Sequence, residues 1–131
     1  MSDKRYLLLI HPDTSIEHVI VKDVSPDFQS LIGGKLFAVK PGLIKLTDVT
    51  LVIDEEAQSN GRPFNSFATF LRGYSDQPIF GTCAITKTTL NTLGLRSFNP
   101  DSFRVICEFV ERLRSYFLNL DTLVLNKVIK S

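Results

Sequence analysis

The chain is poor in the residues and segments that mark specialised classes of protein. It has two cysteines, one methionine and no tryptophan among 131 residues. The apolar run near its start, Tyr6 to Ile10, is too short for a secretion signal, and a bilayer span needs about 20 apolar residues. We therefore expect a cytoplasmic protein that does not associate with a membrane.

An excess of charge is also lacking. The chain has 15 basic and 14 acidic residues and a net charge of +1. Such a balance provides no strong field for a phosphate backbone, so the composition disfavours nucleic acid as a partner. Cys83 and Cys107 both lie among apolar residues in the sequence, and we expect two free thiols rather than a disulfide.

Sequence motifs for common chemistries are absent as well. The chain has no glycine-rich phosphate loop of the G-x-x-x-x-G-K type and no paired metal-ligand spacing. Neither a serine nor a cysteine lies in a recognisable nucleophile setting. We therefore expect a protein that is not an enzyme, with no catalytic residue, no metal and no cofactor.

What the chain does contain is the pattern of one globular domain. Its residues are 44% hydrophobic and 22% charged, and a chain of this length buries roughly two-thirds of its unfolded surface. Apolar runs and alternation predict strands at 6–10, 16–22, 35–40, 49–53 and 79–86. Capping residues and apolar spacing predict helices at 26–32, 64–72 and 100–118. The expected fold is a single α+β domain with an antiparallel or mixed sheet of about five strands and helices mainly on one face.

The predicted C-terminal helix has the clearest amphipathic pattern. Asn99 and Pro100 mark its start, and apolar residues then recur at spacings of three and four. These residues are Phe103, Ile106, Cys107, Val110, Leu113, Phe117 and Leu120. Phe109 and Tyr116 lie outside this stripe, and we expect them to form an interaction surface, in a homodimer or with another protein. Residues 122–130 fit either an extension of the helix or a further strand.

The stretch from Phe28 to Thr86 has a distinctive order of turns. LIGG precedes a predicted strand, and a later predicted strand ends at DEE. NGRPFN then precedes a predicted helix, and DQPIFGT begins the next predicted strand. Together with RYLLLIHPD upstream, this order resembles the DUF3846 family over residues 5–86, although Ala57 and Gln58 replace the family's usual glycine. The resemblance implies a small, uncharacterised protein associated with phages, plasmids or other mobile elements. It divides the domain into a family-like core, 5–95, and a C-terminal helical extension, 96–131.

The loop from Asp54 to Asn65 is the candidate ligand site. It offers carboxylates, amides and a guanidinium beside a helix N-terminus. The candidate ligand-binding residues are Glu55, Glu56, Asn60, Arg62 and Asn65. The structural alternative is that Asn65 caps the helix while Arg62 pairs with Glu55 or Glu56. The adjacent carboxylates also suggest a metal site, but consecutive loop residues point in different directions, which favours a solvated turn.

These features predict a non-catalytic binding or protein-interaction module whose small-molecule ligand is unknown, in the role of an accessory protein of a mobile element. An alternative is a nucleic-acid-binding protein that uses a basic strand edge and an aromatic ring for stacking. Its residues would be Lys35, Lys40 and Lys45, with Phe37 or Phe80. Lysines at a strand edge also keep sheets from pairing with one another, which is the structural explanation.

A second alternative is a small enzyme. His11 and His18 flank the first predicted hairpin and either imidazole could supply a base. The carboxylates of Asp54 to Glu56 are the other candidates for such a role. Cys83 is an unsuitable nucleophile because its apolar surroundings predict a buried, inert thiol.

Overall fold

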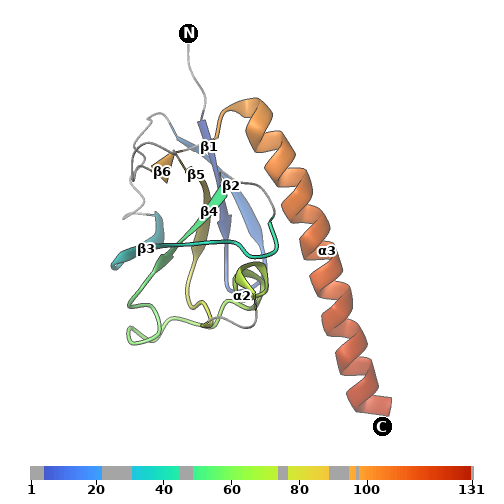
Figure 1. Ribbon diagram of the computed structural model, residues 1–131. Helices are drawn as coiled ribbons and strands as arrows, with labels where there is room; N and C mark the ends of the chain where they lie inside the picture. The colour runs from blue at the N-terminus through green and yellow to red at the C-terminus, as the bar shows by residue number, and fades with distance from the viewer. Residues whose placement is uncertain are drawn as a thin grey trace.

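The computed structural model describes residues 5–21, 31–44, 49–73, 77–88, 95–96 and 98–130 (Figure 1). Its strands are β1 (Arg5–Ile10), β2 (Ile16–Val21), β3 (Leu36–Val39), β4 (Val49–Asp54), β5 (Cys83–Thr88) and β6 (Leu95–Arg96). Five of them lie in the order β2-β1-β5-β4-β3, and β6 pairs with β5. All the pairings are antiparallel, which confirms the predicted α+β fold and decides between an antiparallel and a mixed sheet.

The position of β1 in the sheet explains its continuous apolar run. β1 pairs with β2 along one edge and with β5 along the other, and side chains on both of its faces are buried in clusters. Leu8 and Ile10 belong to the main core, which also contains the buried residues of both helices. Leu7 and Leu9 belong to a smaller cluster on the opposite face, because successive side chains of a strand alternate.

Two helices cover the main-core face of the sheet. They are α2 (Ser66–Arg72) and α3 (Pro100–Lys130). Asn65 caps α2 through its side-chain oxygen, and Asn99 does the same for α3 with an Oδ1 that accepts from the N–H of Ser102 at 2.8 Å. The helices meet at the rings of Phe67 and Phe117, whose centroids are 5.4 Å apart. This arrangement confirms that the helices lie mainly on one face.

The C-terminal helix is longer than predicted. It continues to Lys130, so residues 122–130 extend the helix and do not form a strand. Of the predicted apolar stripe, the buried residues are Phe103, Ile106, Val110 and Phe117. Of the predicted helix at 26–32, only the last two residues lie within the described part of the chain, and both are helical.

The strand predicted at 79–86 begins later, at Cys83. Ile79 instead bonds to the start of α2: its N–H donates to the Thr69 hydroxyl at 2.8 Å and its carbonyl accepts from the N–H of Asn65 at 2.8 Å. Gly81 then turns the chain into β5 with a φ of 75°. The segment from Ile79 to Gly81 therefore leaves the sheet, and the end of β4 loses its neighbour on that side.

Residues 40–44, the described residues that follow β3, do not continue the strand. Gly42 and Leu43 form a turn, and their N–H groups donate to the carbonyls of Arg72 and Leu71 at the end of α2. The turn after β3 is therefore attached to the helix instead of the sheet. Residues 45 and 46 lie outside the described part of the chain.

Candidate functional site

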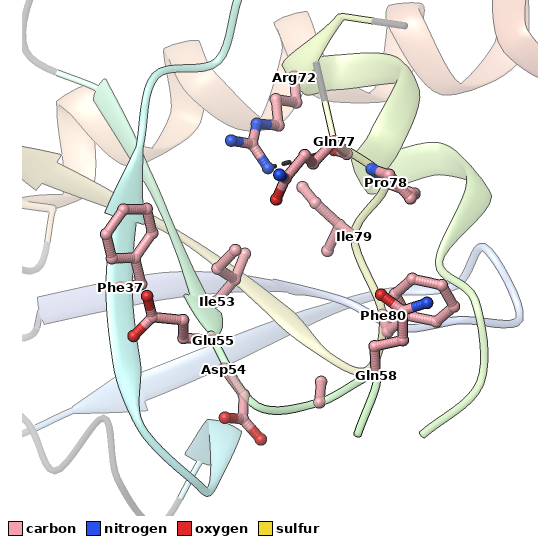
Figure 2. Close-up of a pocket in the computed structure, with 11 residues that line it drawn as sticks. Phe37, Ile53, Asp54, Glu55, Gln58, Arg72, Gln77, Pro78, Ile79 and Phe80 are labelled. Atoms are coloured by element: carbon pink, nitrogen blue, oxygen red, sulfur yellow. Dashed lines mark hydrogen bonds between the residues drawn. The ribbon is translucent and has the colours of Figure 1, made fainter. Parts of the chain in front are cut away.

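A cleft of about 490 Å³ lies where the sheet is left uncovered, between β3 and the segment that leaves the sheet (Figure 2). Its apolar lining comes from β3, the end of β4, the following turn and the segment before β5. These residues are Phe37, Ile53, Ala57, Pro78, Ile79 and Phe80. Its polar lining consists of Asp54, Glu55, Gln58, Arg72 and Gln77.

The floor and one wall of the cleft follow from strand register. Phe37 of β3 is paired with Ile53 of β4, so the two side chains are neighbours on the same face of the sheet. Ile53 and Ile79 are buried, whereas Phe37 is 45% exposed. The ring of Phe37 is exposed because α2 and α3 cover the strands further inside the sheet and β3 is its last strand (Figure 1). An apolar surface thus faces solvent at the sheet edge.

Asp54 lies at one end of the cleft, and its carboxylate already binds other groups of the protein. Its Oδ1 accepts from the backbone N–H groups of Lys35 and Glu56, both at 2.9 Å. Its Oδ2 is buried, accepts no hydrogen bond from the described residues, and lies 4.0 Å from Nε of Arg62. Gly34 passes so close to this carboxylate that an added Cβ would lie 2.1 Å from Oδ1. Asp54 therefore holds two turns together.

The remaining charges of the cleft differ in how they are compensated. Glu55 is paired with Lys35 at 3.5 Å, with both side chains largely exposed. Arg72 donates from Nη1 to the carbonyl of Gln77 at 3.1 Å, and no carboxylate of the described residues lies within ion-pair distance of it. Figure 2 shows its guanidinium at the opposite end of the cleft from Asp54. Arg72 is therefore the charged residue of the lining that has no ion-pair partner among the described residues.

Of the five residues proposed from the sequence as ligand-binding, the structure places Glu55 in the lining of the cleft. Glu56 and Asn60 are exposed on the turn beyond β4 and do not line it. Arg62 is partly exposed and pairs with Asp54, so the expected pairing with Glu55 or Glu56 is corrected. The reason is that Arg62 lies against Gly33 and Gly81, which brings its guanidinium to the buried carboxylate.

Asn65 is fully buried and its polar groups are occupied within the protein. Its Nδ2 donates to the carbonyls of Ile10 and Gly81 at 2.9 and 2.8 Å. Its Oδ1 accepts from the N–H of Ala68 at 3.1 Å. The structure therefore shows the helix cap that we gave as the alternative to ligand binding, together with two long-range bonds that local sequence did not indicate.

Sequence reasoning missed Arg72, and it named Phe37 only as a stacking residue of the nucleic-acid alternative and not as part of a ligand cleft. The alternation of β3 was consistent with one exposed face, but nothing local shows that no helix covers that face. Arg72 ends α2, where a basic side chain is the ordinary complement to the helix dipole. Its proximity to β3 depends on the turn at Gly42, which docks on the end of the helix.

The residues of the nucleic-acid alternative lie around β3. Lys35 and Lys40 are exposed at its two ends, and Lys45 is outside the described residues. Phe37 is exposed within the strand. Phe80 is half-buried and its ring meets Phe64 edge-on, with centroids 5.7 Å apart.

The histidines lie away from the cleft. His11 donates from Nε2 to the Glu17 carboxylate at 2.8 Å, and its Nδ1 is hydrogen-bonded to the Thr82 hydroxyl at 3.1 Å. His18 is exposed on β2, with the ring of Phe103 edge-on at 5.3 Å. Both cysteines are free thiols; burial raises the pKa of Cys83 to about 12 and that of Cys107 to about 11, the latter with a smaller contribution from Glu111.

The two residues expected to form an interaction surface differ in accessibility. Tyr116 is 58% exposed and its ring lies 6.3 Å from that of Phe70. Phe109 is partly buried and packs against the main core. Within the expected surface, Tyr116 is therefore the more accessible of the two side chains.

Fold and cleft define a small α+β domain with a cleft of the size that ligands occupy, roughly 300–1,000 Å³. The chain matches the family model described as "Domain of unknown function (DUF3846)" over residues 4–109, and it belongs to that family. The resemblance seen in the sequence is thus confirmed, and the match continues past residue 95 into α3. No curated protein and no solved structure matches the chain. Within the described ranges, no helix is long and apolar enough to cross a bilayer.

Proposed function

We propose that the chain is a non-catalytic binding module whose ligand occupies the cleft between β3 and Ile79–Phe80. The observation that carries this proposal is the exposed ring of Phe37, which stands beside the buried side chains of Ile53 and Ile79. Apolar surface gains roughly 25 cal/mol per Å² when it is removed from water. A ligand with an apolar body would gain this free energy mainly by covering the ring of Phe37, since Ile53 and Ile79 expose little surface.

The chemistry of the lining supports binding over turnover. Asp54 is held by two backbone N–H groups and Arg62, and Glu55 is paired with Lys35. Both carboxylates are thus engaged in structural contacts. The other lining groups are apolar side chains, amides and one guanidinium, which recognise and orient a ligand but are weak nucleophiles and bases.

The test is a fragment screen by NMR, with neutral and charged apolar fragments and with backbone amide shifts as the readout. We expect shifts at Phe37, Ile53, Ile79 and Phe80 that saturate with concentration. Phe37→Ala should weaken binding, because it removes the exposed apolar wall. Val105→Ala is the matched control, since Val105 is 55% exposed on α3, away from the cleft. Shifts spread evenly over the surface, or equal effects of the two variants, would refute the proposal.

The family resemblance supports a setting for this module: a cytoplasmic accessory protein of a mobile element. The gene neighbourhood tests this directly. Coding sequences of phage or plasmid type beside the gene are the expected result. A neighbourhood of ordinary housekeeping genes in most members of the family would contradict it.

We also retain the proposal of a protein partner, with a homodimer as the simplest form, through the surface at Phe109 and Tyr116. The exposed ring of Tyr116 is the observation that supports it. Sedimentation velocity on the wild type should show a dimer that Tyr116→Ala weakens. A clean monomer throughout the micromolar range would exclude the homodimer.

A further inference from the structure

We infer that the cleft binds apolar monocarboxylates, that is, organic acids with one carboxylate and an aromatic or aliphatic body. The inference rests on the proposed function and adds to it the chemical class of the ligand. The carboxylate would meet Arg72 and the apolar body would lie against Phe37, Ile53 and Ile79. Figure 2 shows these groups on the same cleft, with the guanidinium at one end and the apolar floor beside it.

The expected sign of the ligand's charge follows from which charged residues of the cleft already have a partner of opposite charge. Asp54 and Glu55 each have a cation within 4.0 Å, and Asp54 also accepts two backbone hydrogen bonds. Among the described residues, no anionic group lies within ion-pair distance of the Arg72 guanidinium, which is protonated at every physiological pH.

The geometry of the guanidinium favours a carboxylate over a larger anion. The bond to Gln77 uses Nη1, and no described residue accepts from Nε or Nη2. Nε and Nη2 form one edge of the guanidinium and present two parallel N–H groups, which match the two oxygens of a carboxylate. One arginine balances one negative charge, whereas a phosphate monoester would bring nearly two.

The opposite end of the cleft restricts the rest of the ligand. Asp54 lies there, and Glu55 lies nearer the ring of Phe37 (Figure 2). Each already has one cation as its partner, so a second carboxylate on the ligand would meet these like charges without a cation of its own, and like charges repel each other. The cleft should therefore discriminate against dicarboxylates and accept acids whose far end is apolar.

The experiment compares 4-phenylbutyrate with its uncharged amide, 4-phenylbutyramide, by NMR titration of the full chain. The two probes share the apolar body and differ in the charge that Arg72 would meet. We expect the acid to bind about tenfold more tightly, the lower range for a charge-assisted pair that is partly exposed. Both probes should shift the amides of Phe37, Ile53 and Ile79.

Variants of Arg72 identify the group responsible. Arg72→Gln should reduce the preference for the acid to less than about twofold, since the charge is removed. Arg72→Lys should leave an intermediate preference, because it keeps the charge and loses the planar fork. Arg104→Gln, which removes an exposed arginine of α3, is the matched control and should leave the preference unchanged. Far-UV circular dichroism establishes that each variant is folded.

Three results would overturn the inference, and they separate it from the proposed function. Equal binding of acid and amide at the cleft would refute the ligand class and leave the cleft as a binding site. A preference that survives Arg72→Gln would assign the charge recognition to another group. Absence of shifts with either probe would refute the ligand class, and the fragment screen would then decide whether the cleft binds at all.

A peptide C-terminus presents the same chemistry as a free acid. N-acetyl-phenylalanine, titrated in parallel, distinguishes the two sources. Tighter binding than 4-phenylbutyrate would assign the cleft to chain ends with an apolar last residue. Weaker binding would assign it to free organic acids.

Discussion

Replacement of Asn65 by alanine should cause a large loss of stability, although the residue lies in a segment that reads as a polar loop. The change removes the cap of α2 and leaves the carbonyls of Ile10 and Gly81 without the Nδ2 donor. A lost cap costs about 1 kcal/mol, and each buried carbonyl left without its partner costs about 1 kcal/mol. We therefore expect a loss of about 3 kcal/mol, out of roughly 5–15 kcal/mol for an ordinary domain.

Urea unfolding followed by far-UV circular dichroism measures this loss. With a slope of about 1.5 kcal/mol per M for a small domain, the midpoint should fall by about 2 M. Asn65→Ser separates the contributions: a serine retains an oxygen for the cap but cannot reach both carbonyls, so about 1 kcal/mol should return. Asn60→Ala is the control, because Asn60 is exposed on the preceding loop and its loss should be negligible.

Two outcomes would refute this reasoning. Equal midpoints for Asn65→Ala and Asn60→Ala would show that the buried hydrogen bonds of Asn65 contribute nothing net. Equal losses for Asn65→Ala and Asn65→Ser would show that the cap has no role. The first result would also weaken our explanation for why Gly81 is held away from the sheet, because Asn65 Nδ2 donates to its carbonyl.

Two further predictions concern Gly34 and the thiols. Gly34→Ala should cost about 2–3 kcal/mol of stability or prevent folding, because its φ is 66° and a Cβ would meet the Asp54 carboxylate. Gly61→Ala is the control: its φ is 75° but the space around it is open, so it should cost about 1–2 kcal/mol. Thermal unfolding compares the two variants. The pKa of Cys107 is raised to about 11. Its rate of reaction with a disulfide reagent should therefore rise about tenfold for each unit by which the pH increases, up to that pKa. Cys83 is buried and should react only after unfolding; equal rates in the native protein would contradict this.

Elements that depend on local patterns were predictable from the sequence. The continuous apolar run of β1 indicated an interior strand, and the caps at Asn65 and Asn99 marked the starts of two helices. These signals act within a few residues, where spacing and capping chemistry decide the outcome. Strands β1 to β5, helices α2 and α3 and the single-sheet architecture were therefore predictable, whereas β6 was not predicted.

The cleft was beyond such reasoning because its parts meet only through contacts that are distant in sequence. Asn65 holds Ile79 and Gly81 away from the sheet, and the turn at Gly42 brings β3 against the end of α2. Whether Arg72 is available to an anionic ligand depends on which cations the carboxylates of the cleft pair with. No local pattern records that pairing, so the sequence placed the candidate site one loop away from the cleft.

The strand order has a consequence for biosynthesis. β1 and β2 form a hairpin at the start of the chain, but the other edge of β1 pairs with β5, which is made much later. Until β5 emerges from the ribosome, the apolar side chains of Leu7 to Ile10 have only one strand beside them. Long-range pairing of this kind is slow to form and exposes apolar surface meanwhile. The nascent chain should therefore depend on a chaperone, or on rapid synthesis of its second half, to avoid aggregation.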